Sequence, residues 1–511
     1  MSDIVTLNGY KIKDEKAVRS YETVASMKAD TKLKEGYHVK TKGYYEANDG
    51  GNAEYLITNI ESESEYQENL GNGLYATLIA KNNYNVLQFG VKNDGSTDSS
   101  AIVQNILENI MTRDEILLFP EGLYLFNSPI DMTNCIKRHI KGNFFYNYYS
   151  AITNGLQFNN CSGFINCRSN QFDNLLIRGN SDTYLNNGFQ GLGMVINNCS
   201  ISYFNNGING SGTFTKNTIN RCNTAITGCV DSKIINNTIN ANKHDGINLY
   251  QGCNDNIISE NKVEWNERSG IGCYNTTHNV ISNNIIDRNT NLGISLISCT
   301  GETITNNCLR RNGLLTTTKN RSHLYIEGCT KCIICNNSTQ ANNSQDDGSG
   351  TIVPQYSLEI NTSNNMYLIG NDLSGGTQSD PIYLGSGNIN VRILGANNEK
   401  IYKYAPQKTI NANNGTNTFE IHCVKTGDYS QPNFHKIIAT CRTGEDSGYG
   451  FLEFYAYNYK QYGSNVVRLS QTTINNDLTM SASYNSTDDK FYITITNSST
   501  SQNYNVQLYE Y

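Results

Sequence analysis

One asparagine returns at a nearly fixed interval through the middle of this 511-residue chain. The steps between its copies are 20, 24, 23, 23 and 30 residues, a period typical of solenoids in which each repeat forms one coil. Asparagine suits a turn because its short amide tolerates a left-handed backbone and can hydrogen bond to its equivalent one coil away. We therefore interpret this ladder as structural. Its members are Asn217, Asn237, Asn261, Asn284, Asn307 and Asn337.

A ladder of aliphatic residues has matching steps, and both ladders lengthen at the same place, before Leu324 and Asn337. Within each period apolar residues alternate, as in 245–253 and 322–329, which is typical of short strands with one buried face. The period leaves no room for crossover helices, so the sequence predicts an all-β fold, a right-handed parallel β-helix rising about 4.8 Å per coil. The aliphatic ladder is Ile208, Ile226, Ile247, Ile271, Ile294, Leu324, Leu358 and Ile382.

Charge and hydropathy exclude two classes of partner. The net charge is −7, the pI is near 5.6 and no basic stripe stands out, so we expect no nucleic-acid binding. No apolar run reaches 18 residues, and the N-terminus has neither a basic nor an apolar signal-peptide region. We expect neither membrane insertion nor export by a signal peptide.

Fifteen cysteines occur, and several are in register with the coils: Cys229, Cys253, Cys299 and Cys329, with Thr276 at the equivalent position between them. A cysteine at an equivalent inward position of successive coils acts as a small apolar filler, so we predict stacked, reduced thiols and assembly in a reducing cytoplasm. Zinc is the alternative, but the close pairs among 329, 332 and 335 have no matching second half. We predict no metal and no cofactor.

The chain divides into three predicted regions. Residues 1–85 carry no coil repeat and are interpreted as an attachment or capping module. Residues 86–405 form the β-helix, with an amphipathic capping helix near 99–110 and Thr97 or Asp98 as its N-cap. Residues 406–511 contain longer alternating runs that predict a C-terminal β-sandwich, for trimerisation, carbohydrate binding or plain capping.

The segments FGVKNDGSTDSSAIVQNIL and ILLFPEGLYLF, within residues 86–130, resemble the entry motif of the pectate-lyase-like superfamily. Ser99 departs from the motif, which usually has a second acidic residue there. With the preceding GYYEANDGGNAEYLI and the lack of a signal peptide, the chain resembles bacteriophage tailspike or appendage proteins of hosts with thick cell walls. The resemblance implies a homotrimer in the virion tail, assembled in the host cytoplasm, joined to tail proteins by the N-terminal module, that binds and often cleaves surface polysaccharide.

The ladders also predict which residues point outward on one sheet, and only two of these are acidic. Glu327 and Glu359 lie diagonally on neighbouring coils, about 8 Å apart from strand geometry. A carboxylate pair separated by roughly 6.5 to 9.5 Å suits inverting glycoside hydrolysis, with one acid and one base. The alternative is that the glutamates keep the sheet face soluble. The outward set is Asn248, Tyr250, Gly272, Tyr274, Ser295, Ile297, Tyr325, Glu327, Glu359, Asn361, Tyr383 and Gly385.

Two long insertions, 314–323 and 340–356, precede the strands that carry the glutamates, and extra loop length on a solenoid usually builds a binding face. Asp346 and Asp347 in the second insertion are alternative acids, or a solvated turn. Aromatic and basic residues around this region, and the lone tryptophan at a coil turn, are candidate sugar contacts. They are Tyr274, Arg321, His323, Tyr325, Tyr356, Tyr383 and Trp265.

The leading hypothesis is a tailspike that binds host polysaccharide and hydrolyses it. One rival is a receptor-binding spike with the same fold and no activity. Another is a polysaccharide lyase, which needs a base and charge neutralisation of a uronate, for which Arg310, Arg311, Arg321, His323 and Tyr325 are available. We rank the lyase second to the hydrolase because no acidic cluster for calcium is visible on this sheet.

Overall fold

The structure is a computed structural model. It describes residues 5–7, 10–12, 18–79, 83–144, 154–179, 186–313, 322–340, 354–373 and 381–394, and eight strands between residues 408 and 510. The chain forms two compact units, Met1–Asn398 and Glu399–Tyr511.

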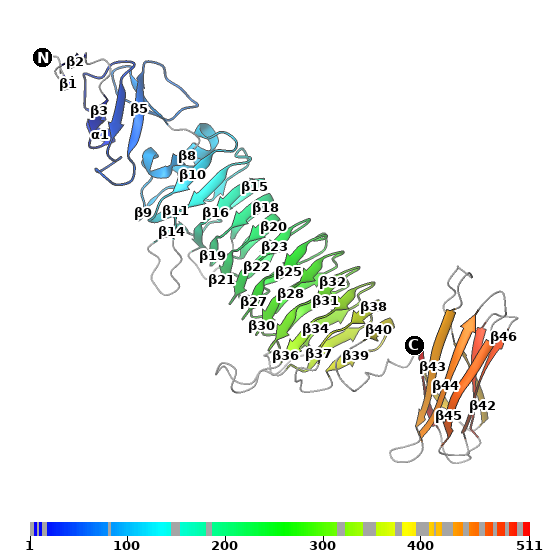
Figure 1. Cartoon of the computed structure of the whole chain (residues 1–511). Helices are drawn as coiled ribbons and strands as arrows, with labels where there is room; N and C mark the ends of the chain where they lie inside the picture. The colour runs from blue at the N-terminus through cyan, green and yellow to red at the C-terminus, as the bar shows by residue number, and fades with distance from the viewer. Residues whose placement is uncertain are drawn as a thin grey trace. The chain divides into compact units, whose positions relative to one another are not determined.

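Parallel strands stacked coil upon coil make up most of the first unit (Figure 1). A full coil has three strands, which we call the first, second and third legs. The first leg contains β12 (Ile130–Asp131), β15 (Phe164–Arg168), β22 (Thr224–Thr227), β25 (Ile247–Leu249), β28 (Ser269–Tyr274), β31 (Leu292–Ile297), β34 (Ser322–Glu327), β37 (Tyr356–Asn361) and β39 (Ile382–Leu384). β18 (Asn187–Asn197) and β20 (Asn206–Thr215) run through the first and second legs without a break.

The strands of the second and third legs are stacked in the same coil order as those of the first leg. The second leg contains β8 (Asn83–Asn85), β10 (Ile116–Phe119), β13 (His139–Gly142), β16 (Gln171–Asp173), β23 (Lys233–Ile235), β26 (Ile257–Ser259), β29 (Val280–Ser282), β32 (Thr303–Thr305), β35 (Ile333–Cys335), β38 (Asn364–Ile369) and β40 (Ile389–Leu394). The third leg contains β9 (Asp94–Asp98), β11 (Leu123–Phe126), β14 (Gly155–Phe158), β17 (Leu176–Gly179), β19 (Ser200–Ser202), β21 (Thr218–Asn220), β24 (Thr238–Asn240), β27 (Lys262–Glu264), β30 (Ile285–Asp287), β33 (Cys308–Arg310) and β36 (Ser338–Gln340). The predicted right-handed parallel β-helix is confirmed.

The aliphatic ladder lies inside the first leg as predicted. Ile247 pairs with Ile271, Ile294 pairs with Leu324, and every other step of the ladder is also a direct parallel pair. Each of these side chains is buried. A fully buried Ile or Leu contributes about 1.5 to 3 kcal/mol, so this column is a main source of stability for each coil.

The asparagine ladder is confirmed as structural and extends to Asn371. Each Nδ2 donates to Oδ1 of the next member at 2.9 or 3.0 Å, and each Oδ1 also accepts from the backbone N–H of the preceding member. The predicted left-handed backbone falls one residue earlier, for example at Asn283 with φ 56°, before Asn284. The expectation that the ladder residue itself is left-handed was wrong: the preceding residue makes the corner, and the ladder amide points inward.

Two further corners carry buried amide ladders that we did not predict from the sequence. One runs Asn242, Asn266, Asn289 and Asn312, with Nδ2 to Oδ1 distances of 2.8 to 2.9 Å. The other begins at Asn256 and Asn279 and continues to a carboxylate, Glu302. The sequence does contain a signal for the first of these, because 242, 266, 289 and 312 repeat with nearly the same steps as the predicted ladder.

The predicted cysteine stack is present. Cys229, Cys253, Cys299 and Cys329 are buried and unpaired, and the Cys299 backbone N–H donates to Cys329 Sγ at 3.4 Å. Thr276 occupies the same column, 3.4 Å from Cys299 Sγ. Within the described ranges, no cluster of histidine, cysteine or acidic side chains could hold a metal ion.

A short helix covers the N-terminal end of the β-helix. It begins as α2 (Ser100–Asn105) and continues as a π-helical turn, η3 (Ile106–Ile110). The N-cap is Ser99, not Thr97 or Asp98, and Ser99 makes no side-chain cap bond. Asp98 nevertheless accepts from the Ser100 backbone N–H at 3.0 Å, so its carboxylate satisfies the first helical donor.

A small mixed sheet precedes the β-helix. Its strand order is β3 (Arg19–Tyr21), β4 (His38–Thr41), β5 (Ala53–Thr58), β7 (Tyr75–Leu78) and β6 (Gln67–Asn69), with α1 (Val24–Lys28) beside it. It contacts the 3-10 turn η2 (Val86–Phe89) and the next residue: Tyr45 Oη donates to the Gly90 carbonyl at 2.8 Å, and the Tyr66 and Phe89 rings meet edge to face. β1 (Val5–Leu7) and β2 (Tyr10–Ile12) form a separate antiparallel pair.

The second unit contains two antiparallel sheets, as the predicted β-sandwich requires. One has the order β41 (Lys408–Ala412), β48 (Tyr504–Glu510), β43 (Asn433–Arg442), β44 (Tyr449–Asn458) and β45 (Asn465–Thr473). The other has the order β42 (Gly415–Ile421), β47 (Lys490–Asn497) and β46 (Leu478–Asn485).

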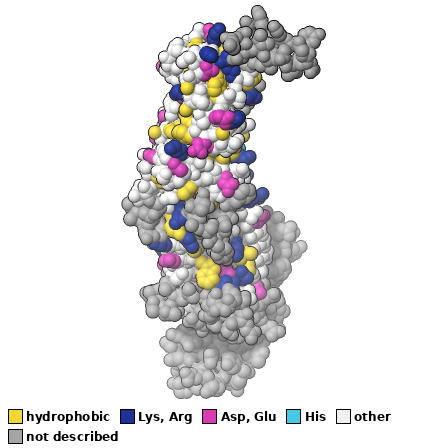
Figure 2. Space-filling view, turned by 90° about the vertical axis from the view of Figure 1, so that its left-hand side faces the viewer, with side chains coloured by type: hydrophobic (Ala, Val, Ile, Leu, Met, Phe, Trp, Pro, Cys, Tyr) yellow, Lys and Arg dark blue, Asp and Glu magenta, His cyan; other side chains and the backbone are white. Residues whose placement is uncertain are grey.

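The surface is polar with charges of both signs. The face shown in Figure 2 carries scattered basic and acidic side chains among wide areas of uncharged polar atoms. No helix among the described residues is both long enough and apolar enough to span a bilayer.

Candidate active site on the first leg

One column of side chains runs along the outward face of the first leg. Parallel pairing joins its members directly, from Gln190 on β18 to Tyr383 on β39. The outward positions predicted from the ladders are confirmed in register, although three of them, Gly272, Ser295 and Tyr325, are buried at the surface of the sheet. The column is Gln190, Asn209, Thr227, Asn248, Gly272, Ser295, Tyr325, Glu359 and Tyr383.

Glu327 and Glu359 lie on adjacent coils with the predicted diagonal offset. Tyr325 pairs with Glu359 and Glu327 pairs with Asn361, so the glutamates are one strand and two residues apart. Glu327 Oε2 accepts a 2.7 Å hydrogen bond from the Tyr325 hydroxyl. Glu359 accepts on both oxygens, from Asn361 Nδ2 at 3.0 Å and from Ser322 Oγ at 3.2 Å. Both carboxylates are half-buried and held in fixed orientations.

Tyr325 sits between the two carboxylates and is 5% exposed. Burial raises the pKa of its hydroxyl, and the hydrogen bond to Glu327 and the charges of both glutamates raise it further. The hydroxyl is therefore a permanent donor to Glu327. The predicted role of Tyr325 as a stacking platform for a sugar ring is wrong, because neither face of the ring is open to solvent.

Two other predicted aromatic residues do form a platform beside the glutamates. The rings of Tyr356 and Tyr383 stack with centroids 5.0 Å apart and an interplanar angle of 26°. Tyr383 is 42% exposed and follows Glu359 in the column. Exposed tyrosine rings of this kind suit contact with the apolar face of a pyranose.

Tyr274 lies two coils before the glutamates and covers a glycine. A Cβ added to Gly272 would lie 2.8 Å from Cε2 of Tyr274, so the ring rests over the backbone of its own strand. Burial raises the pKa of this tyrosine, and the Asp245 charge adds to the shift. Asp245 is buried and faces Arg268 at 3.8 Å. Tyr274 is half-buried and leaves a ring edge at the surface.

His323 is not a surface residue, which corrects the prediction that it contacts substrate. Its imidazole is fully buried inside the β-helix, 3.2 Å from Asn312 Nδ2 at the end of an amide ladder. Burial lowers the pKa of His323 to about 3, so the ring is neutral. The preceding coil has Gly293 at the equivalent place, where a Cβ would already be 2.9 Å from Asn312 Nδ2. The residue at this corner of the coil points inward next to an inward aliphatic residue. The alternation of inward and outward residues along a strand does not predict that.

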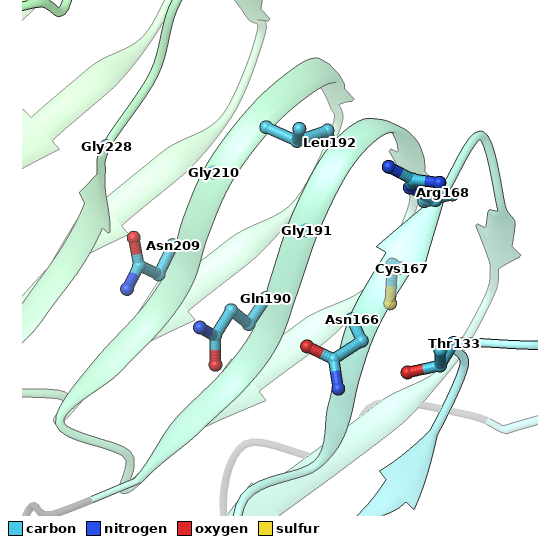
Figure 3. A pocket seen from close by; sticks show the side chains of 10 residues that line it. All are labelled: Thr133, Asn166, Cys167, Arg168, Gln190, Gly191, Leu192, Asn209, Gly210 and Gly228. Carbon is cyan, nitrogen blue, oxygen red and sulfur yellow. The ribbon is translucent and has the colours of Figure 1, made fainter.

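The N-terminal end of the column opens into a pocket with a volume of about 540 Å³ (Figure 3). Its lining comes from β15, β18 and β20 and from the turns beside β12 and β22. We did not predict this pocket from the sequence, because glycines and amides without a carboxylate give no chemical signal. The lining residues are Thr133, Asn166, Cys167, Arg168, Gln190, Gly191, Leu192, Asn209, Gly210 and Gly228.

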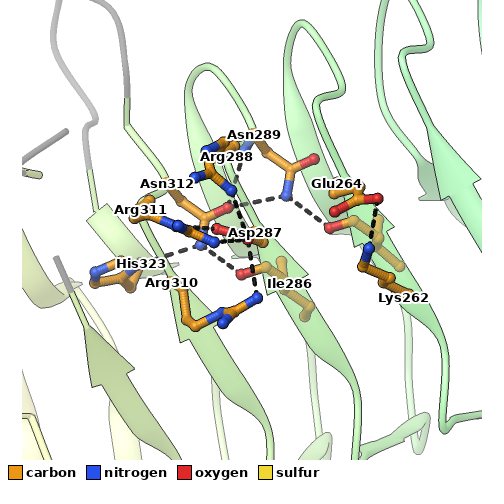
Figure 4. Close-up of polar contacts among 11 residues, drawn as sticks. Lys262, Glu264, Ile286, Asp287, Arg288, Asn289, Arg310, Arg311, Asn312 and His323 are labelled. Carbon is orange, nitrogen blue, oxygen red and sulfur yellow. Dashed lines mark hydrogen bonds and ion pairs between the residues drawn. The ribbon is translucent and has the colours of Figure 1, made fainter. Parts of the chain in front are cut away.

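Two of the residues considered for a lyase, Arg310 and Arg311, gather with Arg288 around one buried carboxylate, Asp287 (Figure 4). Arg288 and Arg310 lie 3.1 and 3.0 Å from Asp287 Oδ2, and Arg311 binds both carboxylate oxygens. Asp287 and Arg311 are almost fully buried, so Arg311 is not available to a substrate. These arginines form a structural cluster at the corner between the third and first legs.

Trp265 occupies the turn between β27 and β28 and is 40% exposed. The Arg288 guanidinium lies over its ring at 4.8 Å, a cation–π contact. The tryptophan therefore belongs to the same corner as Asp287. Arg321, Asp346 and Asp347, also predicted as site residues, lie outside the described residues.

Comparisons with known proteins agree with this fold. Residues 83–334 match the family described as rhamnogalacturonase A/epimerase, pectate lyase-like. The match extends from β8 into β35 and includes Glu327 but not Glu359. A search of curated proteins gives no match. The sequence of most of the β-helix is thus similar to that family over residues 83–334.

Phage tailspikes are among the solved structures that share the fold. Tailspike protein 2 from an Escherichia coli O157:H7 bacteriophage aligns with 12% identity and a TM-score of 0.55, covering 96% of this chain and 80% of that one. The enzymatically active domain of tailspike protein 2 from bacteriophage CBA120 gives the same identity and TM-score, with 97% and 86% covered. The resemblance seen in the sequence is confirmed at the level of the fold.

Proposed function

We propose that this chain is a bacteriophage tailspike or appendage protein that binds a host-surface polysaccharide and hydrolyses it with Glu327 and Glu359. The observation that carries the proposal is the register of β34 and β37, which sets the two half-buried glutamates one coil and two residues apart. Strand geometry gives a separation of about 8 Å. That spacing leaves room for a water molecule between the carboxylates and the scissile bond, as inversion requires.

The hydrogen bonds suggest different roles for the two acids. Both oxygens of Glu359 accept hydrogen bonds, which orients this carboxylate for the role of the general base that activates water. Among the described residues Glu327 accepts on Oε2 only, which leaves Oε1 for the proton that a general acid gives to the leaving oxygen. The stacked Tyr356 and Tyr383 rings would hold the sugar beyond Glu359.

The outward column supports a polymer as the ligand. Amide and hydroxyl side chains follow each other along the first leg, and Glu359 is the only charged member of the column from Gln190 to Tyr383. Such neutral groups hydrogen bond to sugar hydroxyls without selecting a highly charged backbone. The chain's low content of basic residues fits the same interpretation.

The lyase is less well supported than the hydrolase. Arg310 and Arg311 are committed to Asp287, and His323 is buried and neutral, so none of the three faces the glutamates. A non-catalytic receptor-binding spike remains the rival, because it needs the column and the tyrosines but not the pair of acids.

We further propose a homotrimer, joined to the virion tail by the N-terminal module. Large apolar side chains are exposed on the outward face of the second leg, which a second copy would cover: Ile257, Ile333, Tyr367, Ile369 and Ile389, at 41 to 60% exposure. Light scattering should give three times the chain mass, and the double variant Ile333→Lys, Ile369→Lys should lower it. A monomeric wild type would contradict this part of the proposal.

The test of the activity begins with labelled protein on a panel of bacterial strains. Wall and capsule polysaccharide is then extracted from a strain that the protein labels, and release of oligosaccharides is measured. We expect release by the wild type, and a loss of at least about 100-fold in Glu327→Gln and in Glu359→Gln with polymer binding retained. Unchanged release in both variants would refute the pair. Binding without release by the wild type would support the non-catalytic spike.

A further inference from the structure

We propose that the pocket of β15, β18 and β20 is a second glycan-binding site, for a sugar unit that carries one negative charge. The inference rests on the proposed function in one respect, that the chain binds a polysaccharide. It adds a site distant from the glutamates and states the chemistry of the sugar that the site selects.

The floor of the pocket is bare backbone. Gly191, Gly210 and Gly228 stand side by side on successive coils. A Cβ on Gly210 would lie 1.8 Å from the Gly191 carbonyl oxygen, and one on Gly228 would lie 2.6 Å from Asn209 Oδ1. The strands can therefore approach and bend only with glycine at these positions. The result is an open trough whose floor is glycine backbone from β18 to the turn after β22, with Cys167 beside it.

One rim of the trough is a row of amides. Asn166, Gln190 and Asn209 project from neighbouring strands in the same direction (Figure 3), spaced by about 4.8 Å. Asn166 is oriented by Asp131, to which its Nδ2 donates at 3.1 Å. Gln190 Oε1 accepts from Asn187 at 3.1 Å, and no described residue accepts from its NH₂ group. The Asn209 amide has no hydrogen-bond partner among the described residues. Free amides side by side match the hydroxyls of a pyranose.

The other rim supplies a charge and an apolar contact. Arg168 and Leu192 pair across β15 and β18, at the far end of the trough from the amides (Figure 3). Arg168 is exposed, the described residues give its guanidinium no carboxylate partner, and no lining residue is acidic. Leu192 is 61% exposed. A guanidinium opposite a row of neutral amides fits a sugar with a single carboxylate or phosphate.

The pocket and the glutamates belong to one continuous surface. Gln190 reaches Glu359 through seven successive parallel pairs, which corresponds to roughly 34 Å at the usual strand spacing. No charged side chain interrupts the column between them. A polysaccharide lying along the first leg would fill both places at once, so the pocket would hold the chain while the glutamates act several sugar units away.

The experiment measures retention of full-length protein on three immobilised polymers: polygalacturonate for a carboxylate, a sugar-phosphate polymer for a phosphodiester, and dextran for a neutral glycan. We expect retention on one of the acidic polymers and not on dextran, which identifies the anion. Arg168→Gln, and the double variant Gln190→Ala, Asn209→Ala, should each weaken binding about tenfold. The matched control is Gln171→Ala, an exposed glutamine on the second leg.

Each result decides the matter. No retention on either acidic polymer, equal retention on dextran, or unchanged binding by the pocket variants would overturn the proposal; melting temperatures confirm that the variants are folded. Failure of the hydrolase is distinguishable, because Glu327→Gln with Glu359→Gln abolishes release only and leaves retention by the pocket intact.

Discussion

The Tyr325 hydroxyl donates a 2.7 Å hydrogen bond to Glu327 Oε2, and Tyr325 itself pairs across the ladder with Glu359. One buried ring thus separates the two acids and holds one of them by its carboxylate. Because the ring is 5% exposed, Tyr325 acts through its hydroxyl and not through its face. The geometry of the proposed pair therefore depends on a residue that does not touch the substrate.

Tyr325→Phe should lower the rate of polysaccharide hydrolysis by about tenfold or more, because a hydrogen bond to a charged group contributes roughly 1.5 to 3 kcal/mol. The hydroxyl also fixes the orientation of the Glu327 carboxylate, so its loss should lower kcat more than it changes KM. Steady-state kinetics of oligosaccharide release check both effects. Tyr75→Phe, a partly exposed tyrosine of the N-terminal sheet, is the control. An unchanged kcat, or a loss confined to KM, would contradict the positioning role of the hydroxyl.

The sequence predicts the register of the first leg because two properties repeat together, a buried aliphatic residue and a buried amide. Those repeats alone are sufficient to pair Tyr325 with Glu359. They do not predict burial: Ser295 and Tyr325 have outward positions but are covered. His323 was misplaced because the corner at Gly246, Gly270 and Gly293 points inward beside an inward aliphatic residue, which breaks the alternation of a strand. The pocket at Gln190 was missed because no particular spacing of uncharged amides and glycines in a sequence indicates a binding pocket.

Asn284→Ala should strongly destabilise the β-helix. Asn284 Oδ1 accepts from the Asn261 backbone N–H and side chain, and its Nδ2 donates to Asn307 and to the Ile258 carbonyl. Alanine leaves buried donors on Asn261 unpaired, at about 1 to 3 kcal/mol each. Thermal unfolding should show a clear fall in melting temperature. Asn283→Gly is the matched control, because Asn283 is exposed and its φ of 56° suits glycine. Similar shifts in the two variants would contradict the ladder's importance.

Glu302→Gln should reduce the loss of stability that the folded protein undergoes as the pH rises. Burial raises the pKa of Glu302, although Thr276 Oγ1 and the Asn279 backbone N–H each donate to it at 2.7 Å. The folded state thus retains a proton that the unfolded chain releases, and stability is lost as pH rises above the usual glutamate range. Glutamine has no such proton. The melting temperature of the variant relative to wild type should rise between pH 5 and pH 8; a constant difference would show that Glu302 is already ionised when folded.

His323 should make the protein less stable as the pH falls, which is the opposite of the pH dependence expected from Glu302. Its folded pKa is about 3, against 6.5 for an unperturbed histidine, so between these values the unfolded chain binds a proton that the folded chain does not. This contribution to stability is complete above pH 6.5 and is lost as pH falls, by about 2 kcal/mol at pH 5. His323→Asn keeps a polar partner for Asn312 Nδ2 but cannot be protonated. Thermal unfolding at pH 7 and pH 5 should therefore show a smaller acid shift in the variant than in wild type. His278→Asn, at a position 65% exposed, should keep the wild-type shift. Equal acid shifts in all three proteins would mean that His323 binds its proton equally well in the folded and unfolded chains. The neutral ring inferred for His323 would then be wrong.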